Sequence, residues 1–247
     1  MINLAIAIVS AVLATLLLVM GLGVHIAISL PFGLILGVAI FFWMGRKMQV
    51  IMSDLQARMQ KEIQAGKVDR AIDVLKSGMV HKNRHLFVAG QLNSLIGSLY
   101  YVKGKKEHDT ALEYLKKGFF KNFMGHCMQG AIYYQRKDYD NMRKVMDQAL
   151  SMNKKESFVY GMYAWLLYQI KEKDQAMAKL QAGLKKLPND ERLLSNLSLM
   201  QNNKKMKMKV YGEMWVQMML ERSPRMMQEP PRHTMGKFSR KQMFRGR

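Results

Sequence analysis

Side chains that could carry out chemistry are sparse in this sequence. It contains one cysteine, Cys127, and six histidines. A single cysteine can form neither an internal disulfide nor a cysteine-based zinc site. His81 and His85 stand four residues apart, but the histidines as a group show no spacing typical of a metal site. The sequence also lacks a phosphate-binding loop, a nucleophile elbow and a zinc-protease motif. We therefore expect no enzyme activity, no cofactor and no metal.

Small residues and tyrosines recur at intervals of 33 or 34 positions instead. The small series is Gly97, Gly130, Ala164 and Ser198, and the tyrosine series is Tyr101, Tyr134 and Tyr168. Self-similarity at a fixed period is typical of proteins built from stacked structural repeats. Between the recurring positions, apolar residues follow helical spacing and are separated by short polar breaks. The sequence therefore predicts a stack of helices, which presents a surface for holding another molecule.

The pattern resembles the tetratricopeptide repeat, a helix–turn–helix unit of about 34 residues. The clearest unit carries small or large apolar residues, and a proline, where that family has them: Ala164, Leu167, Ala176, Leu180, Gly183 and Pro188. The resemblance covers about 49–221 and departs from the family at Met142 and Lys154. It implies an all-α solenoid of about five helix pairs with atypical end units. The fifth pair would continue in register through Leu197, Val210 and Met214.

The resemblance also implies a concave groove lined by the first helix of each unit. The side chains expected there form an aromatic and amide surface with almost no charge: Gln91, Tyr101, Cys127, Tyr134, Phe158, Trp165, Tyr168 and Gln169. Such a surface suits a protein or peptide partner, because tyrosine and tryptophan dominate binding hot spots. The other interpretation of the tyrosines is packing between neighbouring helices. Ser94, Ser98 and Ala131 replace the basic and amide residues that bind chaperone carboxylate tails, which argues against that ligand.

The first 45 residues contain no Asp, Glu, Lys or Arg. Two apolar runs, about 2–20 and 24–44, flank a break at residues 21–23. A helix of about 20 residues crosses a hydrocarbon core of roughly 30 Å. We therefore predict a transmembrane helical hairpin over 1–45. The alternative is a signal peptide followed by one anchor, but no positive residue precedes position 46.

Basic residues follow the second run directly, beginning with Arg46 and Lys47. The positive-inside rule then places the solenoid in the cytosol. This compact layout resembles that of multi-pass bacterial inner-membrane proteins. Small residues form possible helix-packing faces within the spans, namely Ala7, Ala11, Ala14, Gly33 and Gly37. They could serve the hairpin itself or a homo-oligomer.

The chain carries a net charge of +21, and residues 222–247 hold eight Lys or Arg against one acid. We expect these residues to form a disordered basic tail. Anionic lipid is the nearest counter-charge for a tethered protein, and the expected contacts are Arg46, Lys47, Lys237, Arg240, Lys241 and Arg245. The leading hypothesis is a membrane-anchored scaffold that recruits a protein partner. The alternative is a basic RNA- or ribosome-associated membrane protein, although the chain has no RNA-reading motif.

Overall fold

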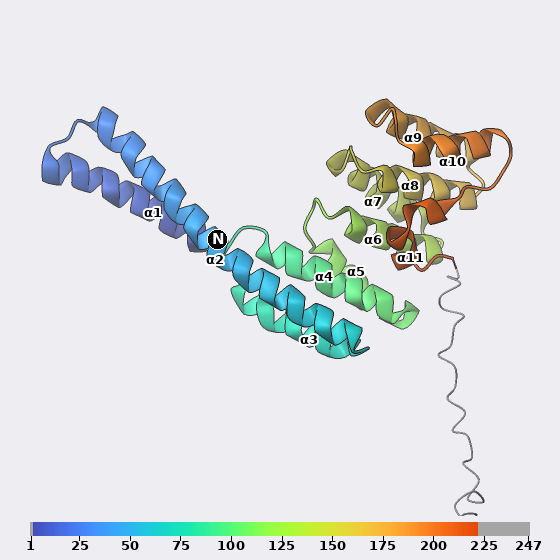
Figure 1. Cartoon of the computed structure of the whole chain (residues 1–247), viewed down its shortest axis with the longest axis horizontal. Helices are drawn as coiled ribbons and strands as arrows, with labels where there is room; N and C mark the ends of the chain where they lie inside the picture. The colour runs from blue at the N-terminus through green and yellow to red at the C-terminus, as the bar shows by residue number, and fades with distance from the viewer. Residues whose placement is uncertain (1, 222–247) are drawn as a thin grey trace, which may run out of the picture.

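The computed structural model of the chain describes residues 2–221, and these residues form helices and turns without a strand. A two-helix hairpin projects from one end of a stack of antiparallel helix pairs (Figure 1). The expected fold class, all-α with stacked helix pairs, is therefore confirmed over the described residues. The predicted tail at 222–247 lies outside them.

The hairpin consists of α1 (Ile2–Leu16), a turn of π-helix (Leu17–Gly21) and the first part of α2 (Ile26–Gln64). Gly23 has a φ of +62°, a conformation that glycine adopts without steric cost. The ring Nδ1 of His25 accepts a hydrogen bond from the backbone N–H of Ala27 at 3.3 Å and so caps α2. The tight connection brings α1 into contact with the first part of α2.

Helix α2 does not end at the foot of the hairpin. We expected a boundary between residues 45 and 49, but α2 continues to Gln64 and supplies the first helix of the first pair. Residues 45–49 contain no proline, and Met48 buries its side chain in the same core as Met52 and Leu55. One unbroken helix therefore joins the hairpin to the solenoid.

Together with the second part of α2, the later helices form successive antiparallel pairs, each packed on the pair before it, and the last helix packs on the final pair. They are α3 (Val68–Ser77), α4 (Val88–Lys103), α5 (His108–Lys116), α6 (Phe123–Gln135), α7 (Tyr139–Met152), α8 (Ser157–Gln169), α9 (Lys173–Lys186) and α10 (Glu191–Gln201). Small residues stand where the two helices of a pair approach most closely. A Cβ added to Gly97 would lie 2.8 Å from Leu115, and one added to Gly130 would lie 2.7 Å from the sulfur of Met146. The expected role of the small-residue series in helix packing is confirmed at these two positions.

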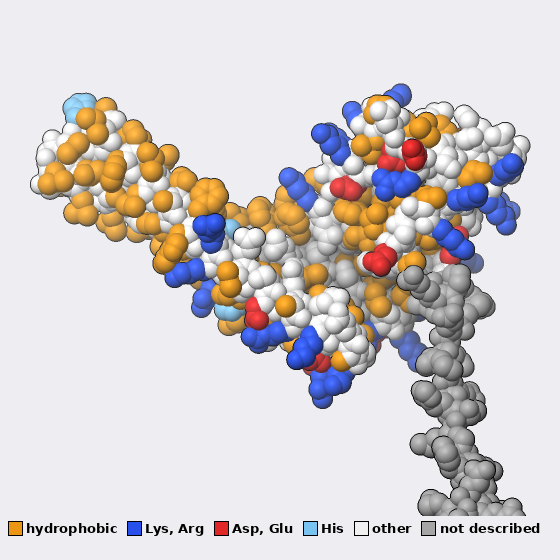
Figure 2. Space-filling model, viewed as in Figure 1, with side chains coloured by type: hydrophobic (Ala, Val, Ile, Leu, Met, Phe, Trp, Pro, Cys, Tyr) orange, Lys and Arg blue, Asp and Glu red, His pale blue; other side chains and the backbone are white. Residues whose placement is uncertain are grey.

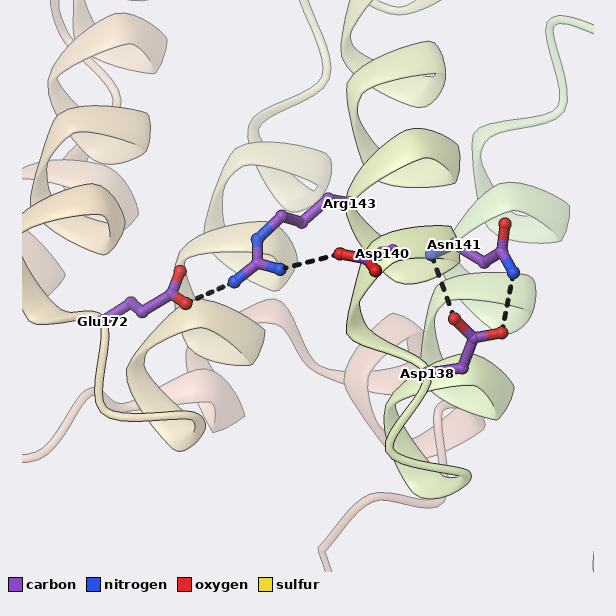
Figure 3. Close-up of polar contacts among 5 residues, drawn as sticks. All are labelled: Asp138, Asp140, Asn141, Arg143 and Glu172. Atoms are coloured by element: carbon purple, nitrogen blue, oxygen red, sulfur yellow. Dashed lines mark hydrogen bonds and ion pairs between the residues drawn. The ribbon is translucent and has the colours of Figure 1, made fainter.

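One edge of the stack, where each pair turns from its first helix to its second, is held by ion pairs between neighbouring pairs. Lys103 of α4 contacts Asp69 of α3 at 2.6 Å, and Arg136 contacts Asp109 of α5 at 2.8 Å. Arg143 of α7 donates to Glu172 at the start of α9 (Figure 3). These contacts add polar links to the apolar packing between units.

The same close-up shows how α7 begins. The carboxylate of Asp138 accepts hydrogen bonds from the backbone N–H of Asn141 at 3.2 Å and from its side-chain amide at 2.7 Å (Figure 3). The pKa of Asp138 is lowered by these hydrogen bonds, first the one from the Asn141 side chain, because both favour the charged carboxylate. The cap fixes the start of the helix that carries Arg143.

The expected fifth helix pair is wrong. Helix α10 ends at Gln201, and no helix packs beside it as α9 packs beside α8 within the described residues. The chain forms a short 3-10 helix (Met208–Tyr211) and then α11 (Glu213–Gln217). Gly212 interrupts them with a φ of +58°. Val210 and Met214, which we expected on one packing helix, therefore lie on two separate turns.

Candidate functional site on the concave face

The segment 204–221 occupies the concave face of the solenoid. It leaves α10 and turns back over the preceding helices, as the dark-orange and red ribbon in Figure 1 shows. At its start, the buried amide of Asn196 accepts from the backbone N–H of Lys207 at 2.7 Å. At its end, the hydroxyl of Tyr101 on α4 donates to the carbonyl of Met218. The segment thus spans from α10 to α4.

Aromatic contacts hold the middle of the segment. Tyr211 packs edge-on against Phe158, with ring centroids 5.4 Å apart, and Trp215 packs edge-on against Trp165 at 4.9 Å. Such pairs contribute roughly 0.5–1.5 kcal/mol each beyond the area that they bury. Gly161 makes room for Tyr211, since a Cβ added there would lie 2.7 Å from the Cζ atom of that ring. These contacts fix the segment along α8.

The expected picture of an open groove is therefore wrong, because the chain covers its own concave face. Four of the predicted groove residues are buried: Tyr101, Cys127, Phe158 and Trp165. Tyr134 and Tyr168 are half-buried at the margin of the same core. Gln91 and Gln169 are exposed. The structure thus brings the predicted aromatic residues together, but as the floor beneath 204–221.

The tyrosines were expected either to line a binding groove or to pack between neighbouring helices, and the structure contains contacts of both kinds. Tyr101 stacks on His108 of α5 with centroids 5.3 Å apart, so it packs within its own helix pair. Its hydroxyl at the same time binds the segment that crosses the concave face. Tyr134 packs edge-on against Trp165 at 5.8 Å and so links α6 to α8.

Burial favours the neutral form of the ionisable groups in this floor and in the segment above it. Burial raises the pKa of Tyr101 and of the Cys127 thiol well above their ordinary values, and burial raises the pKa of Tyr211 to about 12. The pKa of His108 is lowered, first by burial and then by the nearby charges of Arg136 and Lys105. A neutral, apolar floor suits recognition of apolar side chains and leaves Cys127 without thiolate character.

His81 and His85, which stand four residues apart in the sequence, lie at the turn between α3 and α4. His85 stacks on Phe41 of α2 with centroids 5.0 Å apart. The described residues contain no cluster of three or more His, Cys, Asp or Glu that could hold a metal ion.

The small residues of the hairpin face each other across α1 and α2. A Cβ added to Gly37 would lie 2.8 Å from the Cβ of Ala11 and 2.9 Å from the carbonyl of Ala7. One added to Gly33 would lie 2.6 Å from the carbonyl of Ala11. Ala14 is half-buried, and Thr15, which the sequence did not single out, lies against Gly33. In this structure the small face therefore serves the hairpin itself.

The residues that sequence reasoning missed belong to the covering segment. Its buried side chains are Met206, Met208, Tyr211, Trp215 and Met218. The signal that could have indicated them is the loss of helical spacing after α10 together with Gly212. Of the residues predicted to contact anionic lipid, Arg46 and Lys47 are exposed at the foot of the hairpin. The predicted lipid contacts at 237–245 lie outside the described residues.

No protein-family model matches the chain, and no curated protein matches it. Two solved structures are similar over 68% of this chain and 92% of theirs, both with a TM-score of 0.43. They are the MamA RS-1 ArsTM double mutant, at 15% identity, and MamA 41-end from Desulfovibrio magneticus RS-1, at 14%. Since these TM-scores are below 0.5, we draw no functional conclusion from them.

Proposed function

We propose that the chain is a membrane-anchored scaffold of the tetratricopeptide type, which holds a partner's peptide segment at the cytosolic face of a membrane. The observation that carries this proposal is the occupied concave face. Phe158, Trp165 and Tyr101 already bind a segment of two short helical turns, through aromatic packing and a hydrogen bond to its main chain. A surface able to hold one such segment has the chemistry needed to hold another.

The proposed membrane anchor is supported by the exposure of the hairpin. Two helices, Ile2–Gly21 and Ile26–Gln64, are long and apolar enough to span a bilayer, yet only 6% and 17% of their most apolar stretches are buried. A core helix of a soluble protein would be mostly covered. Figure 2 shows the hairpin as a nearly continuous apolar surface, whereas lysine and arginine begin at its foot and continue over the solenoid.

Trp43 and Lys47 support a membrane boundary at the foot of the hairpin. The ammonium of Lys47 lies 3.7 Å from the ring centroid of Trp43, and both side chains are exposed. Tryptophan and lysine together are typical of the headgroup region, where the indole meets apolar lipid and the ammonium meets phosphate. In this proposal, the positive residues after Trp43 keep the solenoid on the cytosolic side, as in a multi-pass inner-membrane protein.

The covering segment indicates the partner's chemistry. Its buried side chains are methionines and large aromatics, so we infer a partner segment rich in such residues. Because 204–221 is tethered, it competes at an effective concentration on the order of millimolar. A partner must therefore bind the floor more tightly than the tethered segment does, or bind when that segment has been released.

A peptide that corresponds to residues 204–221 tests this proposal with the full chain in detergent or nanodiscs. We expect the labelled peptide to bind a Tyr211→Ala/Trp215→Ala variant, whose own segment is weakened, and to bind the parent chain poorly. Adding Trp165→Ala to this variant should abolish binding, because the floor then loses its central aromatic contact.

The matched control is the same peptide with alanine at the positions of Tyr211 and Trp215. Equal binding of both peptides, or binding that survives Trp165→Ala, would contradict a specific peptide site. Circular dichroism establishes that each variant remains helical, so that a lost site is distinguished from a lost fold.

A further inference from the structure

The turns between successive helix pairs all lie on the edge of the solenoid that faces the hairpin. Helix α2 runs from the hairpin into the solenoid, and α3 returns toward it, so the turn 78–87 lies at the foot of the hairpin (Figure 1). Two hydrogen bonds secure this placement. The backbone N–H of Ile2 donates to the carbonyl of Asn83 at 2.8 Å, and that of Asn3 donates to Arg84 at 2.9 Å.

The next turn of this edge is joined directly to the first. In the turn between α5 and α6, the backbone N–H of Phe119 donates to the carbonyl of Gly90 at 2.9 Å. The ring of Phe87 packs on Phe119 with centroids 5.2 Å apart and on Phe120 at 6.0 Å. Residues 78–87 and 116–122, which we call the proximal edge, therefore form one surface.

Large apolar side chains are exposed along the proximal edge. The exposed fractions are 74% for Val80, 49% for Phe87 and 41% for Phe120. Phe87 has a φ of +68°, which is costly for a residue with a bulky side chain. Strained backbone is concentrated at functional positions, where the surrounding structure maintains it. The chain thus holds an exposed phenylalanine in place at a conformational cost.

The charged side chains of the proximal edge are all positive. Its five basic residues are Lys82, Arg84, Lys116, Lys117 and Lys121, and it contains no Asp or Glu. None of the five forms an ion pair within the described part of the chain.

The opposite edge of the same two pairs differs. Residues 64–69 and 103–109 hold four lysines and three acids, and Lys103 contacts both Asp69 and Glu107. The opposite edge therefore mixes lysines with acids, whereas the charged residues of the proximal edge are basic alone.

A hollow of about 320 Å³ opens between the two turns of the proximal edge. Lys82, Phe87 and Phe120 are among the residues that line it, together with the backbone of Gly90 and Gly118. It is therefore large enough for a charged headgroup, with a lysine at its margin and aromatic walls.

We propose that the proximal edge is a second membrane contact, which binds the headgroups of anionic phospholipids in the leaflet that holds the hairpin. Exposed aromatic rings would enter the interfacial region, and the unpaired lysines and arginines would neutralise lipid phosphates. This inference rests on the proposed function, since the hairpin must first place the edge beside the leaflet. The solenoid would then lie against the membrane along its inter-unit turns.

Site-specific labels on the full chain test this contact, because the one native thiol, Cys127, is buried and the label goes to an introduced cysteine. We place an environment-sensitive fluorophore at Phe120→Cys or at Val102→Cys. Val102 is the matched control, because it is 42% exposed and lies at the opposite end of α4 from Phe87. Each protein is reconstituted in nanodiscs of phosphatidylcholine, with or without phosphatidylglycerol.

We expect phosphatidylglycerol to shift the emission at position 120 to shorter wavelength and to leave position 102 unchanged. Lys82→Gln/Arg84→Gln/Lys121→Gln should abolish the shift, whereas Lys67→Gln/Lys105→Gln/Lys106→Gln should retain it. Equal responses at both positions, no response at either, or retention of the shift after the first triple substitution would overturn the inference. A shift caused by added RNA in phosphatidylcholine nanodiscs would assign the edge to nucleic acid and would also overturn it.

Flotation with phosphatidylcholine vesicles separates this inference from the membrane anchor. A chain that fails to float would overturn both the anchor and the lipid contact. A chain that floats but shows no anionic-lipid response at position 120 overturns the proximal-edge contact alone. Equal thermal unfolding of the two triple variants establishes that the substitutions leave the fold intact.

Discussion

Tyr101 combines two functions that sequence reasoning treats as alternatives. Its ring packs on His108 within one helix pair, and its hydroxyl binds the carbonyl of Met218 from the far end of the described chain. The sequence could predict that Tyr101 faces inward, because its position within the repeat determines the face. It could not predict the covering segment, because nothing local to Tyr101 specifies which residues lie above it.

His108 predicts a pH dependence of stability. Its pKa is lowered from 6.5 in the folded chain, first by burial, so the unfolded chain binds more protons in this range. Stability from the neutral ring is complete above pH 6.5 and is lost as pH falls through the lower folded-state pKa. We expect thermal unfolding between about pH 8 and pH 5 to show a larger loss for the parent chain than for His108→Gln. Parallel curves for the two proteins would contradict this assignment.

Gly161 provides a steric test of the covering segment. An added methyl group would lie 2.7–2.8 Å from the ring carbons of Tyr211, so we expect Gly161→Ala to cost about 1–3 kcal/mol in unfolding free energy. It should also speed thiol labelling of Cys127 by loosening the segment. Gly125→Ala is the control, because its nearest contacts are at 3.5 Å and alanine favours a helix. Rescue of Gly161→Ala by Tyr211→Leu would establish that the clash is with this ring.

At the scale of elements, the regular pairs were predictable and the C-terminal elements were not. Gly97 and Gly130 stand in the sequence at the period that their packing requires, so α4 to α7 could be located in advance. Val210 fitted the same period, but it is exposed, and Gly212 stops the helix that would have buried it. Periodicity identifies helices that pack on their neighbours. It gives no information on a segment that crosses several of them.

The ion pair between α7 and α9 predicts a measurable coupling between units. Arg143 and Glu172 have side chains that are 30% and 28% exposed, so their interaction is only partly screened by solvent. A double-mutant cycle with Arg143→Met and Glu172→Met should give a coupling of about 1 kcal/mol in unfolding free energy.

The control cycle for that coupling is Arg58 with Asp54 on α2, whose side chains are 67% and 52% exposed. We expect about 0.3–0.5 kcal/mol for this pair, because it is an exposed contact within one helix. A coupling at Arg143 and Glu172 no larger than that of the control would contradict a role in joining the units.

At the scale of the whole molecule, the sequence predicted two apolar helices followed by a solenoid, but it placed a boundary between them. The change from apolar to charged residues after Met44 is abrupt, and we used this change to place the boundary. The backbone does not follow that change, because nothing in residues 45–49 breaks a helix. A change in amino-acid composition is thus not a boundary between two helices.

The unbroken α2 predicts a fixed distance between the hairpin turn and the solenoid. Gln49→Pro should kink α2, because proline removes a backbone donor and clashes with the preceding turn, at a cost of roughly 3 kcal/mol. Spin labels on the hairpin turn and on α10 should give a narrow distance distribution in the parent chain and a broad one in this variant. Gln49→Ala, at the same exposed position, should remain narrow. A broad distribution in the parent chain would contradict a rigid connection.

Helix α2 is 39 residues long, or about 58 Å at 1.5 Å per residue. A helix also turns by about 100° with each residue. The azimuth of the solenoid around the hairpin axis is therefore set by how many residues separate Gly37, which contacts α1, from Met48, which enters the solenoid core. One residue more or fewer would rotate the solenoid by more than a quarter turn, whereas seven, close to two full turns, would nearly restore it. The number of residues in this stretch thus sets the direction in which the solenoid faces around the hairpin axis, as well as its distance from the hairpin.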